Sequence, residues 1–166
     1  MSYTVAKVKT FTGRGGRGYS AQLLFDGKVV ADAFNEGNGG DVNLDWHDKS
    51  KRVPLTVVEK PGSPIAHFWP EEAKLLQFCK GQTRSFLDEI FDLTIYLYVG
   101  ELVDNFVLEK ELRRKCKTKT CFRLKSSGSD TYMCYSAVYT KEVQDTLKKR
   151  YGDDLELIYN ETLFKG

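Results

Sequence analysis

The side chains best suited to chemistry in this sequence are cations, and they gather in one segment. Residues 110–125, KELRRKCKTKTCFRLK, hold eight Lys or Arg and one acidic residue, whereas residues 85–109 hold six acidic residues and no basic one. Bases near a helix C-terminus complement its macrodipole, which explains part of this segment. It does not explain the cations that alternate with other residues as the chain becomes extended: Lys117, Lys119, Arg123 and Lys125. Such a row suits the gripping of phosphates, and a solvated basic face is an equal alternative.

A second candidate lies in FTGRGGRGYS, residues 11–20, which has four glycines and two arginines. A phosphate-binding P-loop needs Lys and then Ser or Thr after its last glycine, with a helix behind it, and the dinucleotide fingerprint also needs a helix. Here Tyr19 and an expected strand follow instead. The pattern therefore favours the tip of a hairpin over a phosphate cradle. The alternative is a mobile flap whose Arg14 and Arg17 close over an anion.

DVNLDWH, residues 41–47, offers the only plausible acid–base pair, His47 with Asp45 or Asp48. It begins like a calcium-binding loop, but Trp46 stands where that loop needs Gly, and Arg52 stands where it needs a bidentate Glu. Strand alternation gives this segment one apolar and one polar face, so a solvated strand face is favoured over a site. A small hydrolase that uses Asp45 and His47 is kept as a minor alternative.

The cysteines predict neither a metal site nor a redox pair. Cys79, Cys116, Cys121 and Cys134 form no C-x-x-C pair, and with two histidines in the chain no zinc pattern can be written. We therefore expect four free thiols, no metal and no cofactor. The first residues lack the apolar stretch of a signal peptide, and no run of about 18 apolar residues occurs. These features predict a cytoplasmic protein without a membrane partner.

The elements that would carry these residues follow from periodicity and turn residues. Four short strands joined by turns predict an antiparallel meander at residues 3–11, 19–26, 29–34 and 41–46. An edge strand is expected at 55–58, between Pro54 and Pro61.

Helices are expected over residues 70–81 and from Thr83 to about Arg114, with Gly100 as a kink or break. A β-hairpin, a helix that ends at Gly152 and a strand over 155–160 complete the chain.

This order predicts an α+β fold: an N-terminal four-stranded antiparallel meander, central helices, and a C-terminal β-hairpin–helix–strand. The length of 166 residues fits a single domain over 1–166, and a division into sub-lobes at 1–60 and 69–166 is left open. With 41% hydrophobic and 29% charged residues the chain is globular rather than disordered. The net charge of +2 implies no partner by itself.

Three blocks of the sequence resemble a family of small uncharacterised phage and bacterial proteins. They are G-x-G-Y-x-A-x-L-x-x-D-G-K-V-V at 16–30, E-G-N-G-G at 36–40, and the tail that begins RRKCKTKTCFRL at 113 and continues through Y-T-K-E-V to KKRYGD. The family offers no known activity to carry over. The resemblance implies a phage accessory or counter-defence role, in which proteins of this size are often inhibitors or ligand sequesterers.

Together these observations predict a binding protein more readily than an enzyme. The leading hypothesis is non-catalytic binding of a phosphate-bearing ligand, either a nucleotide or a nucleic acid. Its site would combine the four cations Lys117, Lys119, Arg123 and Lys125 with Arg14 and Arg17 on the glycine-rich loop. The alternatives are a protein-interaction module that inhibits a host factor through its acidic helix, and the small hydrolase named above.

Overall fold

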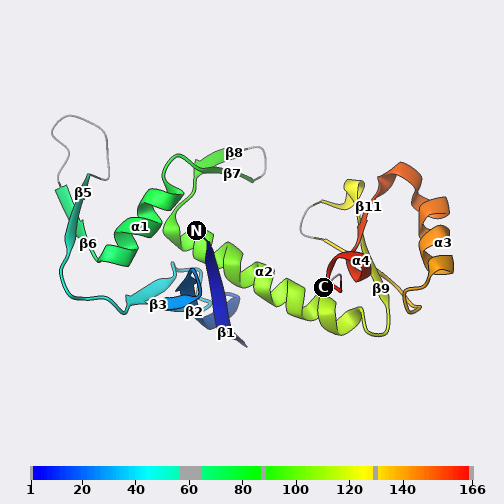
Figure 1. The fold of residues 1–166 in the computed structure, drawn as a ribbon, viewed down its shortest axis with the longest axis horizontal. Helices are drawn as coiled ribbons and strands as arrows, with labels where there is room; N and C mark the ends of the chain where they lie inside the picture. Colours follow the sequence, from blue (N-terminus) through cyan, green and yellow to red (C-terminus); the bar gives the residue numbers. More distant parts are fainter. Residues whose placement is uncertain (1, 57–64, 87–88, 129–130, 165–166) are drawn as a thin grey trace. The chain divides into compact units, whose positions relative to one another are not determined.

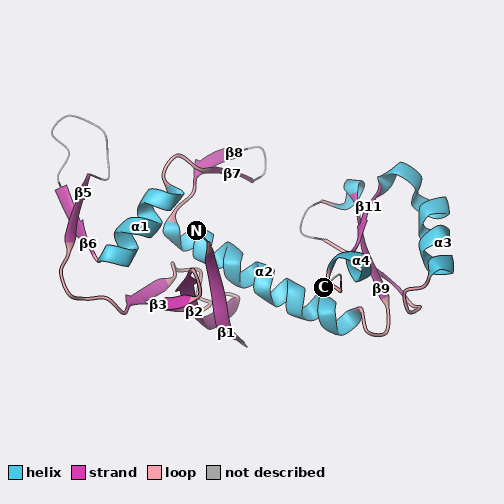
Figure 2. Ribbon diagram, in the orientation of Figure 1, coloured by secondary structure: helices cyan, strands magenta, loops and turns pink. Residues whose placement is uncertain are grey.

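The computed structural model of the chain describes residues 2–56, 65–86, 89–128 and 131–164. The fold is α+β, as predicted: strands β1 to β6 come before α1, and helices and strands are mixed in the rest of the chain (Figures 1 and 2). Contacts divide the chain into two compact units, residues 1–106 and 107–166, which we call the N-terminal and C-terminal units. Helix α2 (Ile95–Lys115) contributes to both. The expectation of a single domain stays a prediction.

The N-terminal unit begins with the predicted meander. Its sheet has the strand order β1-β2-β3-β4 and is antiparallel throughout, with bounds β1 (Tyr3–Thr12), β2 (Arg17–Phe25), β3 (Lys28–Asn35) and β4 (Asn43–Trp46). Asp26 and Gly27 both have positive φ, at 45° and 82°. Two such residues make the type I′ turn that matches the twist of the strands they join.

The inner face of the meander is apolar because strand residues alternate between the two faces of the sheet. Tyr19, Ala21 and Leu23 of β2 are buried, as the period of two predicts. Tyr3 of β1 is also buried, and its ring contacts Phe78 of α1 (Pro70–Cys79) and Tyr98 of α2. These aromatic contacts attach both helices to the sheet.

Helix α1 starts where the sequence predicts. Trp69 is the N-cap, Pro70 follows at the first helical position, and the Glu72 carboxylate accepts a hydrogen bond from the Trp69 amide at 3.1 Å. Proline has no amide hydrogen that would lack a partner in the first turn of the helix. The Glu72 carboxylate accepts from the Trp69 amide, which has no acceptor within the helix. Gly81, with φ of +74°, follows the C-terminal end.

The helix predicted from Thr83 is wrong at its start. The segment there forms a hairpin, β7 (Thr83–Phe86) and β8 (Glu89–Asp92), and α2 starts only at Ile95. β-Branched and aromatic residues favour strands, and Ile90, which a helix would have to bury, is 75% exposed. Thr94, rather than Thr83, accepts a hydrogen bond from the first turn, at the Leu97 amide. The helix then continues through Gly100 without a break.

A second hairpin precedes α1. Strands β5 (Val53–Thr56) and β6 (Ile65–Phe68) pair antiparallel, with Val53 opposite Phe68. The predicted edge strand at 55–58 therefore begins two residues earlier, and residues 57 and 58 lie outside the described part of the chain. The sequence does not indicate strand β6.

The C-terminal unit is a three-stranded antiparallel sheet in the order β10-β9-β11, accompanied by helices. Its elements after α2 are β9 (Thr120–Leu124), β10 (Met133–Tyr135), α3 (Lys141–Tyr151), β11 (Leu155–Ile158) and α4 (Tyr159–Thr162), with short 3-10 turns at Lys125–Ser127 and Gly152–Asp154. The predicted hairpin and the helix that ends at Gly152 are confirmed.

The last predicted strand is too long, because Tyr159 and Asn160 belong to α4. The core of this unit joins Phe122 and Leu124 of β9 to Leu147 of α3 and Ile158 of β11. Within the described residues, no helix is both long and apolar enough to cross a membrane.

Candidate functional site

The predicted row of cations around β9 does not lie on one extended strand. Lys117 and Lys119 occupy the turn between α2 and β9, where both are exposed. Arg123 lies in β9 and Lys125 begins the 3-10 turn that follows. The chain becomes extended only at Thr120, so the alternation read from the sequence covers a turn, a strand and a second turn.

Arg123 forms an ion pair with a residue of the neighbouring strand β11. Its Nε and Nη2 atoms donate to the two carboxylate oxygens of Glu156 on β11, both at 2.7 Å. This two-pronged ion pair raises the pKa of Arg123 and ties β9 to β11. The guanidinium is therefore less available to an anion than the side chains of Lys117, Lys119 and Lys125.

A buried amide fixes the shape of the turn that carries Lys117 and Lys119. Asn160 of α4 accepts a hydrogen bond from the Cys121 amide at 2.8 Å. Its Nδ2 donates to the carbonyl oxygens of Cys116 and Lys119, at 3.1 and 2.9 Å. Three backbone groups on both sides of the turn thus bond to one side chain that is 9% exposed. The two lysines project from a backbone that this side chain holds in place.

Two further cations join this turn from the last turns of α2. Lys110 and Arg114 are exposed and precede Lys117 with the spacing i, i+4 and i+7, which places all three on one side of the helix and its continuation. The sequence contains this signal, but the helix macrodipole accounts for Arg114 equally well. The other two cations of this helix end are paired, Arg113 with Glu109 and Lys115 with Glu111, both at 2.8 Å.

Charge is divided unevenly between the two units. The C-terminal unit has 13 Lys or Arg and nine Asp or Glu, a net charge of +4. The N-terminal unit has 12 and 14, a net charge of −2. The net charge of the whole chain is small because the positive charge of the C-terminal unit is partly cancelled by the negative charge of the N-terminal unit.

The glycine-rich loop, residues 12–18, packs its backbone against the connection between β3 and β4. The Gly15 amide donates to the Gly37 carbonyl at 2.7 Å. A Cβ on Gly13 would lie 2.2 Å from the Glu36 carbonyl oxygen, and one on Gly37 would lie 2.5 Å from the Gly18 nitrogen. Glycine is thus needed here for close backbone approach. As expected, this segment leads into β2, which begins at Arg17, and not into a helix.

The two arginines of this glycine-rich segment, Arg14 and Arg17, have different surroundings. Arg17 forms an ion pair with Asp104 of α2 within the N-terminal unit. Arg14 is exposed and lines a shallow hollow with Glu36 and Asn38. The backbone contacts of the loop and the Arg17 ion pair argue against a freely moving flap. The anion-binding role of Arg14 and Arg17 stays a prediction, and these residues belong to a different unit from the cations around β9.

The acid–base pair predicted at β4 is not formed by the expected residues. His47 Nε2 lies 2.8 Å from Asp32 of β3, and Asp45 instead pairs with Lys49 at 2.6 Å. The sequence does not indicate Asp32, because its proximity to His47 comes from the pairing of β3 with β4. The hydrogen bond from His47 lowers the pKa of Asp32. Among the described residues, no hydroxyl or thiol forms a hydrogen bond with the His47 ring.

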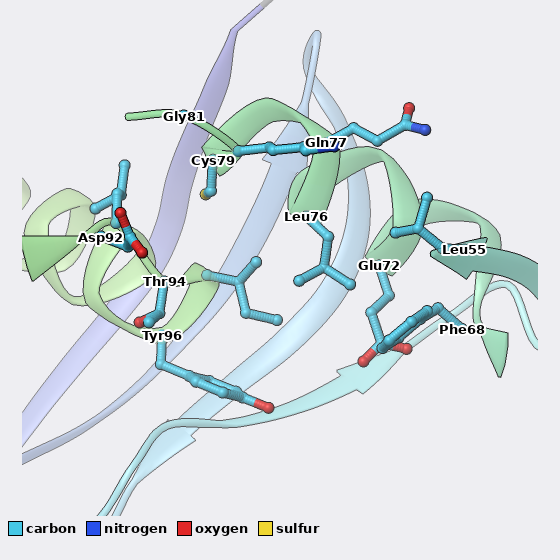
Figure 3. Close-up of a pocket in the computed structure, with 13 residues that line it drawn as sticks. Leu55, Phe68, Glu72, Leu76, Gln77, Cys79, Gly81, Asp92, Thr94 and Tyr96 are labelled. Atoms are coloured by element: carbon cyan, nitrogen blue, oxygen red, sulfur yellow. The ribbon is translucent and has the colours of Figure 1, made fainter. Parts of the chain in front are cut away.

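A pocket of about 520 Å³ lies elsewhere in the N-terminal unit (Figure 3). It is bounded by β5, β6, α1, β8 and the start of α2, and Leu76 and Tyr96 extend into it from the two helices. Its carboxylates are Glu72 and Asp92, and its only cation among the described residues is Lys80. Two acidic groups against one base do not suit a phosphate, and none of the predicted site residues lines this pocket.

Neither a cluster of metal ligands nor a known relative identifies the site. Among the described residues, no three His, Cys, Asp or Glu side chains are grouped so as to hold a metal ion. No protein-family model, no curated protein and no solved structure matches the chain. The resemblance to phage and bacterial proteins thus gains no support from these comparisons, and the function has to be inferred from the geometry.

Proposed function

We propose that the protein binds nucleic acid without catalysis, through the cations that flank β9. One observation carries this proposal. Within the described residues, five exposed side chains before and after β9 make no ion pair and no hydrogen bond: Lys110, Arg114, Lys117, Lys119 and Lys125. Unpaired cations on a unit of net charge +4 are available to phosphates without the loss of internal ion pairs.

The spacing of these cations favours a polyanion over a single nucleotide. Lys119 and Lys125 stand at opposite ends of β9, six residues apart. At about 3.3 Å per extended residue, their Cα atoms lie on the order of 20 Å from each other. A strand of duplex DNA advances about 3.4 Å per phosphate, so this span corresponds to about six nucleotides. One nucleotide would reach only one end of the strand.

The ion pairs of α2 weaken the protein-inhibitor alternative. A protein that inhibits a partner through an acidic helix needs carboxylates that are free to bind that partner. In α2, however, Asp104, Glu101, Glu109 and Glu111 each pair with a cation. The hydrolase alternative lacks its pair, because Asp45 and His47 bond to different residues. The cytoplasmic location and the phage accessory role remain part of the proposal.

The experiment compares two variants of equal charge. One replaces Lys110, Lys117, Lys119 and Lys125 by Gln, and the matched control replaces four exposed lysines of the N-terminal unit by Gln: Lys7, Lys9, Lys28 and Lys51. Fluorescence anisotropy measures the binding of labelled single-stranded and duplex oligonucleotides of about 20 nucleotides over a range of salt, a length that exceeds the span of β9.

We expect the parent and the control to bind and the first variant to bind weakly. For duplex DNA, the slope of log affinity against log salt should fall by up to about 0.9 for each lost phosphate contact. Equal loss in both variants would assign binding to overall charge. A parent that binds no oligonucleotide at low salt would refute the proposal. A further variant, Arg14→Gln with Arg17→Gln, tests the loop in the same assay.

A further inference from the structure

Two thiols face each other across the β9–β10 strand pair of the C-terminal unit. Cys121 and Cys134 are directly opposite in register, between the pairs Phe122–Met133 and Thr120–Tyr135. Their Sγ atoms lie 3.2 Å apart. Directly opposed residues of antiparallel strands have Cα separations of about 4.5–5.5 Å, within the range of about 4.4–6.8 Å that a disulfide bridges. A bond between them therefore needs little movement of the backbone.

The two thiols differ in access. Cys134 is exposed, whereas Cys121 has no exposed surface. Burial raises the pKa of the Cys121 thiol, and its neighbour Cys134 raises it further. A reagent in solution can therefore reach the Cys134 thiol but not the Cys121 thiol. The Cys121 sulfur is close enough to Cys134 to react with it afterwards. This order, an accessible attacking thiol with a resolving thiol beside it, is the arrangement that dithiol reactions require.

We propose that Cys134 and Cys121 form a reactive dithiol site for low-molecular-weight disulfides. The Cys134 thiolate attacks one sulfur of the reagent disulfide, forms a mixed disulfide and releases the other half as a thiol. Cys121 then gives up its proton and attacks the Cys134 sulfur, which forms the cross-strand disulfide and releases the second half. The two protein thiols lose two electrons and two protons, and the reagent disulfide becomes two thiols.

Of the other two cysteines, Cys79 is a suitable control and Cys116 is a possible competitor. Cys79 lies in the N-terminal unit, is 3% exposed, and burial raises its pKa to about 11. Cys116 is 6% exposed and hydrogen-bonds Cys121, so it is the competing partner for the buried thiol. The register of β9 and β10 favours Cys134, since Cys116 lies in no strand.

The test treats the full chain with excess oxidised glutathione, blocks the remaining thiols with a maleimide, and maps the products by mass spectrometry. We expect the parent to lose two of its four thiols to a Cys121–Cys134 disulfide that dithiothreitol reverses. Cys121→Ala should stop at a glutathione adduct on Cys134. Cys134→Ser should not react, and Cys79→Ser should behave as the parent does.

Peptide mapping of the unmutated chain tests for the Cys121–Cys134 disulfide even if a variant fails to fold. A Cys116–Cys121 disulfide, a stable adduct at Cys134 with Cys121 still reduced, or no reaction of the folded parent would each overturn the proposal. Far-UV circular dichroism before and after treatment establishes that the reacting protein is folded.

Discussion

Replacing Asn160 by Ala should destabilise the C-terminal unit by about 3 kcal/mol. The change removes one acceptor and two donors, and leaves the Cys121 amide and the Cys116 and Lys119 carbonyls without their Asn160 partner. A buried polar backbone group left unpaired costs about 1–3 kcal/mol. We take about 1 kcal/mol for each of the three, because water can enter beside the exposed turn.

Hydrogen exchange at the Cys121 amide measures this effect directly, since that amide donates to the missing side chain. A loss of about 3 kcal/mol corresponds to exchange that is roughly 100-fold faster. The substitution Asn160→Asp nearly preserves the side-chain volume, but it removes both donors and sets a charge against two carbonyls. It keeps an acceptor for the Cys121 amide, so its loss of stability comes from the Cys116 and Lys119 carbonyls alone.

The matched control is Thr162→Ala, in the same short helix. Thr162 is exposed and its hydroxyl bonds the local Tyr159 carbonyl, at 3.2 Å. We expect a change below about 0.5 kcal/mol. Exchange at Cys121 that is less than about 10-fold faster in Asn160→Ala, or an unchanged rate in Asn160→Asp, would refute the hydrogen-bond reasoning.

Two glycines should respond oppositely to alanine. Gly13→Ala should lower the free energy of unfolding by about 1–3 kcal/mol, because the new Cβ would clash with the backbone of residues 36 and 37. Gly100→Ala should raise it by about 0.5–1 kcal/mol, because Gly100 lies within α2 and no atom would contact the new Cβ. Urea denaturation measures both changes. Removing the ring with His47→Ala should raise the pKa of Asp32 toward its ordinary value, as followed by NMR titration of the carboxyl group. Because the folded pKa is lowered, the stabilisation is present above the ordinary pKa of Asp and is lost as the pH falls through the folded value; an Asp32 pKa that His47→Ala leaves unchanged would contradict this.

The elements that can be predicted from the sequence are those whose signals are local. Alternating residues in β1 to β4, the I′ turn at Asp26–Gly27, and the Pro70 start of α1 each depend on interactions within a few residues, so their physics is visible in the chain order. The concentration of cations between residues 110 and 125 is likewise a property of composition. These signals were enough for the α+β fold.

Which of the candidate site residues have partners cannot be predicted from the sequence and depends on the folded chain. Residues 83–92 are predicted as helix but form β7 and β8, which pair with each other. Arg123 and Lys117 are both cations of the same basic segment. Arg123 forms an ion pair with Glu156, 33 residues later in the chain, whereas Lys117 pairs with no acidic side chain among the described residues. His47 meets Asp32, and Cys121 meets Cys134, through register. Pairing between strands depends on the whole fold, because a side chain's neighbours across a sheet are distant in the chain.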